Sequence, residues 1–127
     1  MYLFAKQGSQ VQSKEINQTA CREDPVIVCR NCHGHITEPS CQIQMDGAFC
    51  HTFANPSGQV FEIGCFSAAP GCAAVPPLFS EFSWFPGYEW RIGICRDCTT
   101  HLGWVFRSDQ DQFWGLILDK LHFPQKE

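Results

Sequence analysis

Two cysteine pairs of the form C-x-x-C constrain the fold of this chain more than any other feature of its sequence. They are Cys29-Arg30-Asn31-Cys32 and Cys95-Arg96-Asp97-Cys98, and 62 residues separate them. A C-x-x-C turn lets two thiolates converge on one ion, and two such turns complete a tetrahedral site of four sulfur ligands. Because that set leaves no position open for water, the spacing predicts one structural Zn²⁺ ion, with iron as the alternative metal.

Two other interpretations of the cysteine pairs explain less of the sequence. Cys32 is followed by His33, which fits the C-x-x-C-H pattern of haem attachment, but Cys98 is followed by Thr99, so the second pair would have no role. A redox C-x-x-C prefers a helix N-terminus in an α/β pattern, which this sequence lacks. The nine cysteines are odd in number, so they cannot all form disulfides within one chain.

Short apolar or alternating runs between turn residues predict an antiparallel all-β fold from residue 25 onward. The polar stretch at 1–24 is rich in Gln and Ser and predicts a flexible N-terminal arm, which leaves 25–127 as one domain. The segment 67–77 is rich in Ala, Pro and Gly and is expected to be irregular, and 119–121 is expected to form one helical turn. The expected strands are 26–29, 48–53, 59–65, 88–94, 102–107 and 113–118.

Composition and charge exclude several classes of partner. The chain has 127 residues and a formal net charge of −4, whereas nucleic-acid binders carry a basic stripe. No apolar run approaches the roughly 18 residues that cross a bilayer, and the first residues lack the basic and apolar regions of a signal peptide. These features predict a soluble, cytoplasmic monomer that binds neither nucleic acid nor membrane.

Three of the four tryptophans, Trp84, Trp90 and Trp104, fall within 21 residues. The Pro86-Gly87 turn is expected to fold Trp84 back near Trp90, and the second cysteine turn is expected to bring Trp104 onto a third neighbouring strand. The three indoles are expected on three adjacent strands, where they either fill a core or form three walls of a box, and the need of each N–H for a partner favours a rim. A box of this kind would take a methylated ammonium group or a small flat neutral ring.

Six motifs in a fixed order resemble those of a known family. They are Cys29-x-x-Cys32, Asn55-Pro56-x-Gly58, Phe82-Ser83-Trp84-Phe85-Pro86-Gly87-Tyr88-x-Trp90, Cys95-x-x-Cys98, His101-Leu102-Gly103-Trp104 and Phe113-Trp114-Gly115-Leu116. On these residues, about four-fifths of the chain resembles the CULT domain, the thalidomide-binding domain of cereblon, in its stand-alone bacterial form. The ordered combination is far more specific than either cysteine pair alone.

The resemblance implies a β-tent, in which two antiparallel sheets meet at a steep angle and are pinned by the zinc site. It also implies that a cage of aromatic side chains binds glutarimide or a related cyclic imide, with the hydrogen-bonding edge on the backbone of Phe82 and Trp84. Asn55 would lie at the pocket mouth and Phe106 on the floor. The full implied set of ligand-binding residues is Asn55, Phe82, Ser83, Trp84, Trp90, Trp104 and Phe106.

The sequence as a whole predicts a non-enzymatic binding module for cyclic imides, such as terminal imides formed from Asn or Gln, or uridine-like metabolites. Cereblon carries His at the position of Phe82, and no counterpart of its Lon-like domain, which contacts the ubiquitin-ligase adaptor, is expected in this chain. One alternative is an enzyme of the methionine-sulfoxide reductase B type, which shares the β-tent, but the Arg-x-Cys-x-Asn motif is missing and Cys65 is the nearest candidate. The other alternative is a reader of methylated ammonium groups.

Overall fold

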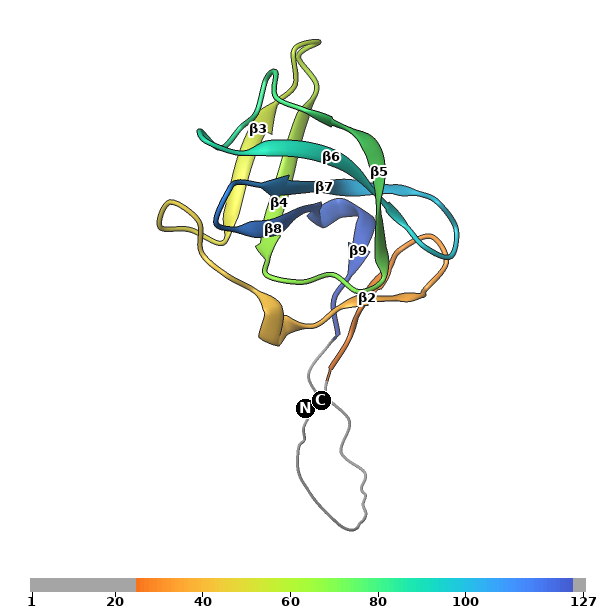
Figure 1. The fold of residues 1–127 in the computed structure, drawn as a ribbon. Coiled ribbons are helices and arrows are strands. Elements are labelled where there is room, and N and C mark those ends of the chain that lie inside the picture. Colours follow the sequence, from red (N-terminus) through yellow and green to blue (C-terminus); the bar gives the residue numbers. More distant parts are fainter. Residues whose placement is uncertain (1–24, 125–127) are drawn as a thin grey trace.

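The computed structural model describes residues 25–124, so the arm predicted for 1–24 and the last three residues of the predicted domain lie outside the described part. Within this range the chain forms short strands and two single turns of 3₁₀ helix (Figure 1). In chain order they are β1 (Ile27–Cys29), β2 (His35–Thr37), η1 (Pro39–Cys41), β3 (Cys50–Ala54), β4 (Val60–Phe66), β5 (Cys72–Phe79), β6 (Glu89–Cys95), β7 (His101–Arg107), β8 (Gln112–Ile117), η2 (Leu118–Lys120) and β9 (Leu121–His122).

The strands form two antiparallel sheets, which confirms the predicted all-β class. The small sheet has the order β2-β1-β9, and the large sheet has the order β3-β4-β8-β7-β6-β5. Figure 1 shows the large sheet curling over the small one, with β9 leading from β8 into the small sheet. No helix among residues 25–124 is long and apolar enough to cross a membrane.

The prediction of an irregular segment at 67–77 is wrong over its second half, because β5 begins at Cys72 and continues to Phe79. β5 is an edge strand that pairs only with β6, and the register shifts between Val75 and Phe79. Pro76 and Pro77 fall inside that irregular stretch. A proline cannot donate to a ladder, and an edge strand with a break in register is where this loss is tolerated.

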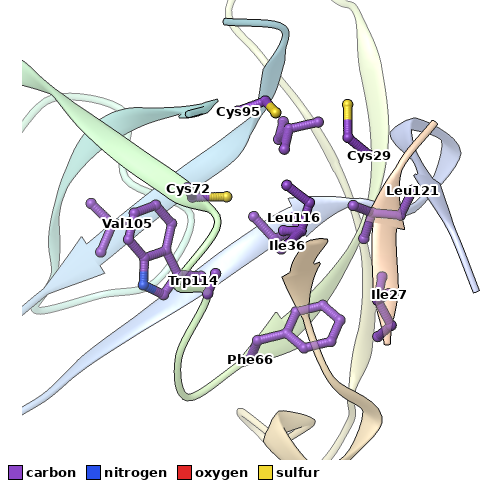
Figure 2. Packing of buried hydrophobic residues seen from close by; sticks show 12 residues of the cluster. Ile27, Cys29, Ile36, Phe66, Cys72, Cys95, Val105, Trp114, Leu116 and Leu121 are labelled. Carbon is purple, nitrogen blue, oxygen red and sulfur yellow. The ribbon is translucent and has the colours of Figure 1, made fainter. Parts of the chain in front are cut away.

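A first apolar core fills the space between the two sheets (Figure 2). Ile27 and Ile36 from the small sheet meet Phe66 and Trp114 from the large sheet, and all four are at most 9% exposed. The burial of side chains of this size contributes about 1.5–3 kcal/mol each. The small sheet is therefore held by packing, because strands of two or three residues have little stability of their own.

A second apolar core lies on the opposite face of the large sheet. Phe106, Phe113 and Ile117 point to this face, and Phe85 from the loop between β5 and β6 covers them. The ring of Phe85 stands edge to face at 5.0 Å from both Phe106 and Phe113. The large sheet is thus apolar on both faces, and a loop rather than a sheet covers the outer one.

Candidate metal centre and aromatic pocket

Each cysteine pair begins at the last residue of a strand, and the two strands belong to different sheets. β1 of the small sheet ends at Cys29, and β6 of the large sheet ends at Cys95. The four sulfur atoms of Cys29, Cys32, Cys95 and Cys98 lie within 4.8 Å of one another. The predicted convergence of the two pairs is confirmed, and the cluster joins the two sheets.

The two cysteine turns have the same backbone conformation. The His33 N–H donates to the Cys29 carbonyl at 2.8 Å, and the Thr99 N–H donates to the Cys95 carbonyl at 2.9 Å. The residue after each second cysteine is left-handed, with φ of 66° at His33 and 64° at Thr99. A β-branched residue such as threonine rarely adopts this conformation, so the turn is strongly determined by its surroundings.

The spacing of the sulfur atoms fits a tetrahedral metal ion. Cys29 and Cys98 lie 3.7 Å apart and Cys32 and Cys95 lie 3.6 Å apart, measured between Sγ atoms. A Zn–S bond of about 2.3 Å in a tetrahedron requires sulfur atoms roughly 3.8 Å apart. The four cysteines can therefore hold a metal ion with little change in the backbone.

The thiols of the cluster differ in acidity, because the pKa of Cys98 is lowered whereas the pKa values of Cys29 and Cys32 are raised. Hydrogen bonds from the side chains of Asn31 and Thr100 lower the pKa of Cys98 to about 6, which favours the thiolate that a metal requires. Burial raises the pKa of Cys65 to about 12. Cys65 is fully buried, so it lacks the activated thiolate that a reductase would use.

A cavity of about 460 Å³ opens on the face of the large sheet that points away from the small sheet. Six residues of the predicted ligand-binding set line it: Asn55, Phe82, Trp84, Trp90, Trp104 and Phe106. The other lining residues, which are outside the predicted ligand-binding set, are Pro56, Gln59, Phe61, Ile92, His101, Ile117 and Lys120. Ser83 is absent from the lining, and its hydroxyl donates instead to the Phe85 carbonyl at 3.1 Å.

Strand register brings two of the three tryptophans to one face of the sheet. Trp90 on β6 is opposite Phe106 on β7, and Ile92 is opposite Trp104. Trp84 was expected on a strand but lies in the loop before β6, and its ring stands edge to face with Trp104 at 4.7 Å. The expectation of three indoles from three adjacent strands is therefore wrong, although all three tryptophans line one cavity.

The indole N–H groups of the two outer tryptophans already have partners in the protein. Trp84 Nε1 donates to the Ala54 carbonyl at 3.1 Å, and Trp90 Nε1 donates to the Glu81 carbonyl at 2.8 Å. These bonds fix the orientation of both rings. A ligand would meet their apolar faces rather than their polar edges.

Phenylalanine rings support the outer tryptophans from behind. Phe53 stacks on Trp84 with ring centroids 4.9 Å apart and planes 13° apart, and Phe79 stacks on Trp90 at 4.6 Å and 28°. Stacked aromatic pairs add about 0.5–1.5 kcal/mol beyond the area that they bury. The walls are thus held in place before any ligand enters, which reduces the entropic cost of binding.

A bulge in β7 turns His101 into the cavity. The register shifts where Ile94 pairs with His101, so Leu102 is an extra residue on β7. Leu102 is fully buried in the core between the sheets, while the His101 ring stands edge to face with Trp104 at 5.0 Å. Gly103 makes the bulge possible, because its φ is +156° and a Cβ there would overlap the Gly115 carbonyl oxygen.

Relatives named cereblon match most of this chain. Protein cereblon of Drosophila persimilis is 33% identical over 105 residues, which cover 75% of this chain and 17% of the relative. Protein cereblon of Drosophila yakuba is 29% identical over 112 residues, 80% of this chain and 19% of the relative. Over this length the chain matches the cereblon-type domain. It spans less than a fifth of the length of these two curated relatives.

The fold of the cereblon-type domain recurs in a solved structure of low sequence identity. The crystal structure of the Mis18 'Yippee-like' domain superposes with a TM-score of 0.57 and 14% identity, covering 83% of this chain and 99% of that one. At this identity the likeness concerns the fold alone. No family model matches the sequence.

Proposed function

We propose that this cereblon-type domain is a non-enzymatic binding module for small cyclic imides, stabilised by one structural Zn²⁺ ion. The observation that carries the proposal is the cavity walled by Trp84, Trp90 and Trp104, whose flat faces are left for a ligand. The indole planes of Trp84 and Trp104 stand 75° apart, and flat faces at such an angle admit a thin ring and exclude bulky or strongly hydrated groups. Glutarimide and the uracil ring are both of that shape.

The backbone at the rim of the cavity supports recognition of an imide edge. An imide presents a carbonyl, an N–H and a second carbonyl in one line, so it needs an acceptor flanked by donors. Within residues 25–124 the backbone N–H and C=O groups of Phe82 and Trp84 have no hydrogen-bond partner. Phe82 is left-handed with φ of 61° and its side chain is 71% exposed, and such strain concentrates at functional positions.

The donor set of the metal centre supports zinc in a structural role. Four thiolates complete the coordination shell of Zn²⁺, so no site remains for an activated water. The reductase alternative is disfavoured because the pKa of Cys65 is raised to about 12 by burial. The methyl-ammonium alternative is disfavoured because Lys120 lines the cavity and neither Glu81 nor Glu89 does so.

Glutarimide is expected to quench the tryptophan fluorescence of the domain saturably, and N-methylglutarimide is expected to do so only at higher concentrations. Methylation removes the N–H and leaves the backbone acceptor of the rim unpaired, which costs about 1–3 kcal/mol and lowers affinity roughly 5- to 150-fold. The measurement is a fluorescence titration with both compounds. Equal quenching by both would contradict recognition through the imide edge, and absence of binding by either would contradict the proposed function.

Trp104→Leu is expected to weaken glutarimide binding about 30-fold or more, because it removes a wall of the cavity. The matched control is Trp114→Leu. Trp104 and Trp114 are each 9% exposed and lie on neighbouring strands, but Trp114 belongs to the core on the other face of the sheet. Both variants should lose similar stability and keep their metal, so binding measured by calorimetry isolates the role of the cavity. An unchanged affinity in the Trp104 variant would contradict the site.

A further inference from the structure

The cavity has polar side chains in its lining in addition to the tryptophan walls. Its volume of about 460 Å³ is far more than one six-membered imide ring occupies. His101, where β7 begins, and Lys120, which ends η2, line the cavity near enough for the charge of Lys120 to act on His101, and the part that they line is its polar end. Because ligand pockets bury most of their ligand, a ligand that fills this cavity carries a substituent on the ring.

The charge at this end is positive in a chain that is acidic overall. The formal net charge of the chain is −4, yet no Asp or Glu is among the described residues that line the cavity. Lys120 is the only lysine between positions 25 and 124. Its ammonium group has no salt bridge with any carboxylate of the described range. The one lysine of the described range thus lines the ligand cavity, where its ammonium group can meet an anion.

The position of Lys120 is fixed through the metal centre. The Lys120 carbonyl accepts a hydrogen bond of 2.9 Å from the N–H of Arg30, which lies inside the first cysteine turn. The next residue, Leu121, pairs with Cys29 in the small sheet. The backbone on both sides of the lysine is therefore anchored, and only its side chain is free to adjust to a ligand.

His101 completes this end without adding charge. Its Nε2 lies 3.0 Å from the Gly103 carbonyl oxygen, and because a carbonyl only accepts, Nε2 carries the hydrogen. Burial, with a smaller contribution from the charge of Lys120, holds the pKa of His101 below its usual value. The neutral ring is a polar neighbour, and Lys120 alone supplies the positive charge.

We propose that the natural ligand has two parts: a cyclic-imide head between the tryptophans and an anionic group, a carboxylate or a phosphate, beside Lys120. The inference rests on the proposed function and names the class of ligand within it. The expected gain is modest, because Lys120 is exposed to solvent. An exposed ion pair contributes about two- to fivefold in affinity and weakens as salt is added.

The test uses two probes that differ only in charge. One is 3-aminoglutarimide acylated with succinic acid, which has a free carboxylate, and the other is its primary amide. Wild-type protein is expected to bind the acid about two- to fivefold more tightly than the amide, and Lys120→Gln to bind them equally. Arg107→Gln is the matched control, because it removes the same charge from the exposed far end of β7. It should keep the preference for the acid.

Three outcomes would overturn the inference while leaving the proposed function intact. They are equal binding of acid and amide by the wild type, a preference that survives in Lys120→Gln, and a preference that is independent of ionic strength. Failure of both probes to bind would instead overturn the proposed function. A second pair, uridine and uridine 5′-phosphate, distinguishes the source of the charge. A gain limited to the succinyl probe identifies a carboxylate, and a gain limited to the nucleotide identifies a phosphate.

Discussion

Removal of the metal ion is expected to unfold residues 25–124 as one unit. A structural Zn²⁺ site of four thiolates contributes an apparent 10–16 kcal/mol or so at pH 7, comparable to or larger than the roughly 5–15 kcal/mol of a whole domain. The site joins β1 to β6, and the small sheet consists of strands of only two or three residues. Such strands do not persist without the contacts that the metal and the core between the sheets provide.

Two cysteine variants with matched exposure test this expectation. Cys32 and Cys50 are both exposed, but only Cys32 belongs to the four-sulfur cluster. Cys32→Ser should lose the metal and the near-ultraviolet circular dichroism of the packed tryptophans, whereas Cys50→Ser should keep both. Metal content is measured by mass spectrometry of the purified protein. A chelated protein that still melts in one cooperative transition at the original temperature would show that the ion is dispensable.

Gly103→Ala is expected to cost more than about 4 kcal/mol of unfolding free energy. Two effects combine at this position, since φ is +156° and the new Cβ would overlap the Gly115 carbonyl oxygen on the neighbouring strand. The overlap can be removed only if β7 and β8 move apart, because the Gly115 carbonyl oxygen belongs to the backbone and cannot rotate away as a side chain could. Losses of this size are exceptional for one methyl group and are diagnostic of such a clash.

Gly58→Ala measures the cost of a left-handed backbone conformation alone, without a steric clash. Gly58 has φ of +88°, but nothing lies within 4 Å of a Cβ placed there. This variant should lose only about 1–2 kcal/mol, the cost of a left-handed residue with a side chain. Urea denaturation of the metal-loaded variants gives both values. Equal losses in the two variants would show that the bulge of β7 tolerates a side chain.

Much of the fold follows from patterns that act over a few residues. The cysteine spacing predicts the cluster, and alternation predicts that Phe61, Ile63 and Cys65 share one face, as they do in the second core. β2 and β9 could not be predicted, because segments of three and two residues are too short to show an alternation of apolar and polar side chains. Their stability comes from pairing with β1 rather than from their own composition.

The candidate site was predictable only in part, because its geometry depends on departures from regular structure. The tryptophans were evident from their spacing, but Trp84 is placed by a loop whose path no periodicity encodes. His101 and Leu102 exchange faces at the bulge, so strict alternation places each of them on the wrong side of β7. Lys120 reaches the cavity through a single turn after β8, and no local pattern distinguishes it from a surface lysine.

The pairing of β1 with β9 has a consequence for how such a domain is shared among proteins. Val28 is opposite His122 and Cys29 is opposite Leu121, so the polypeptide enters and leaves the folded unit at neighbouring positions. A folded unit whose two chain ends are adjacent can be inserted into a surface loop of another domain without distorting either of them. The curated relatives contain the matching residues within chains more than five times as long as the matched segment. Strand β1, which ends at the four-cysteine cluster, would then lie at the junction between the inserted unit and its host.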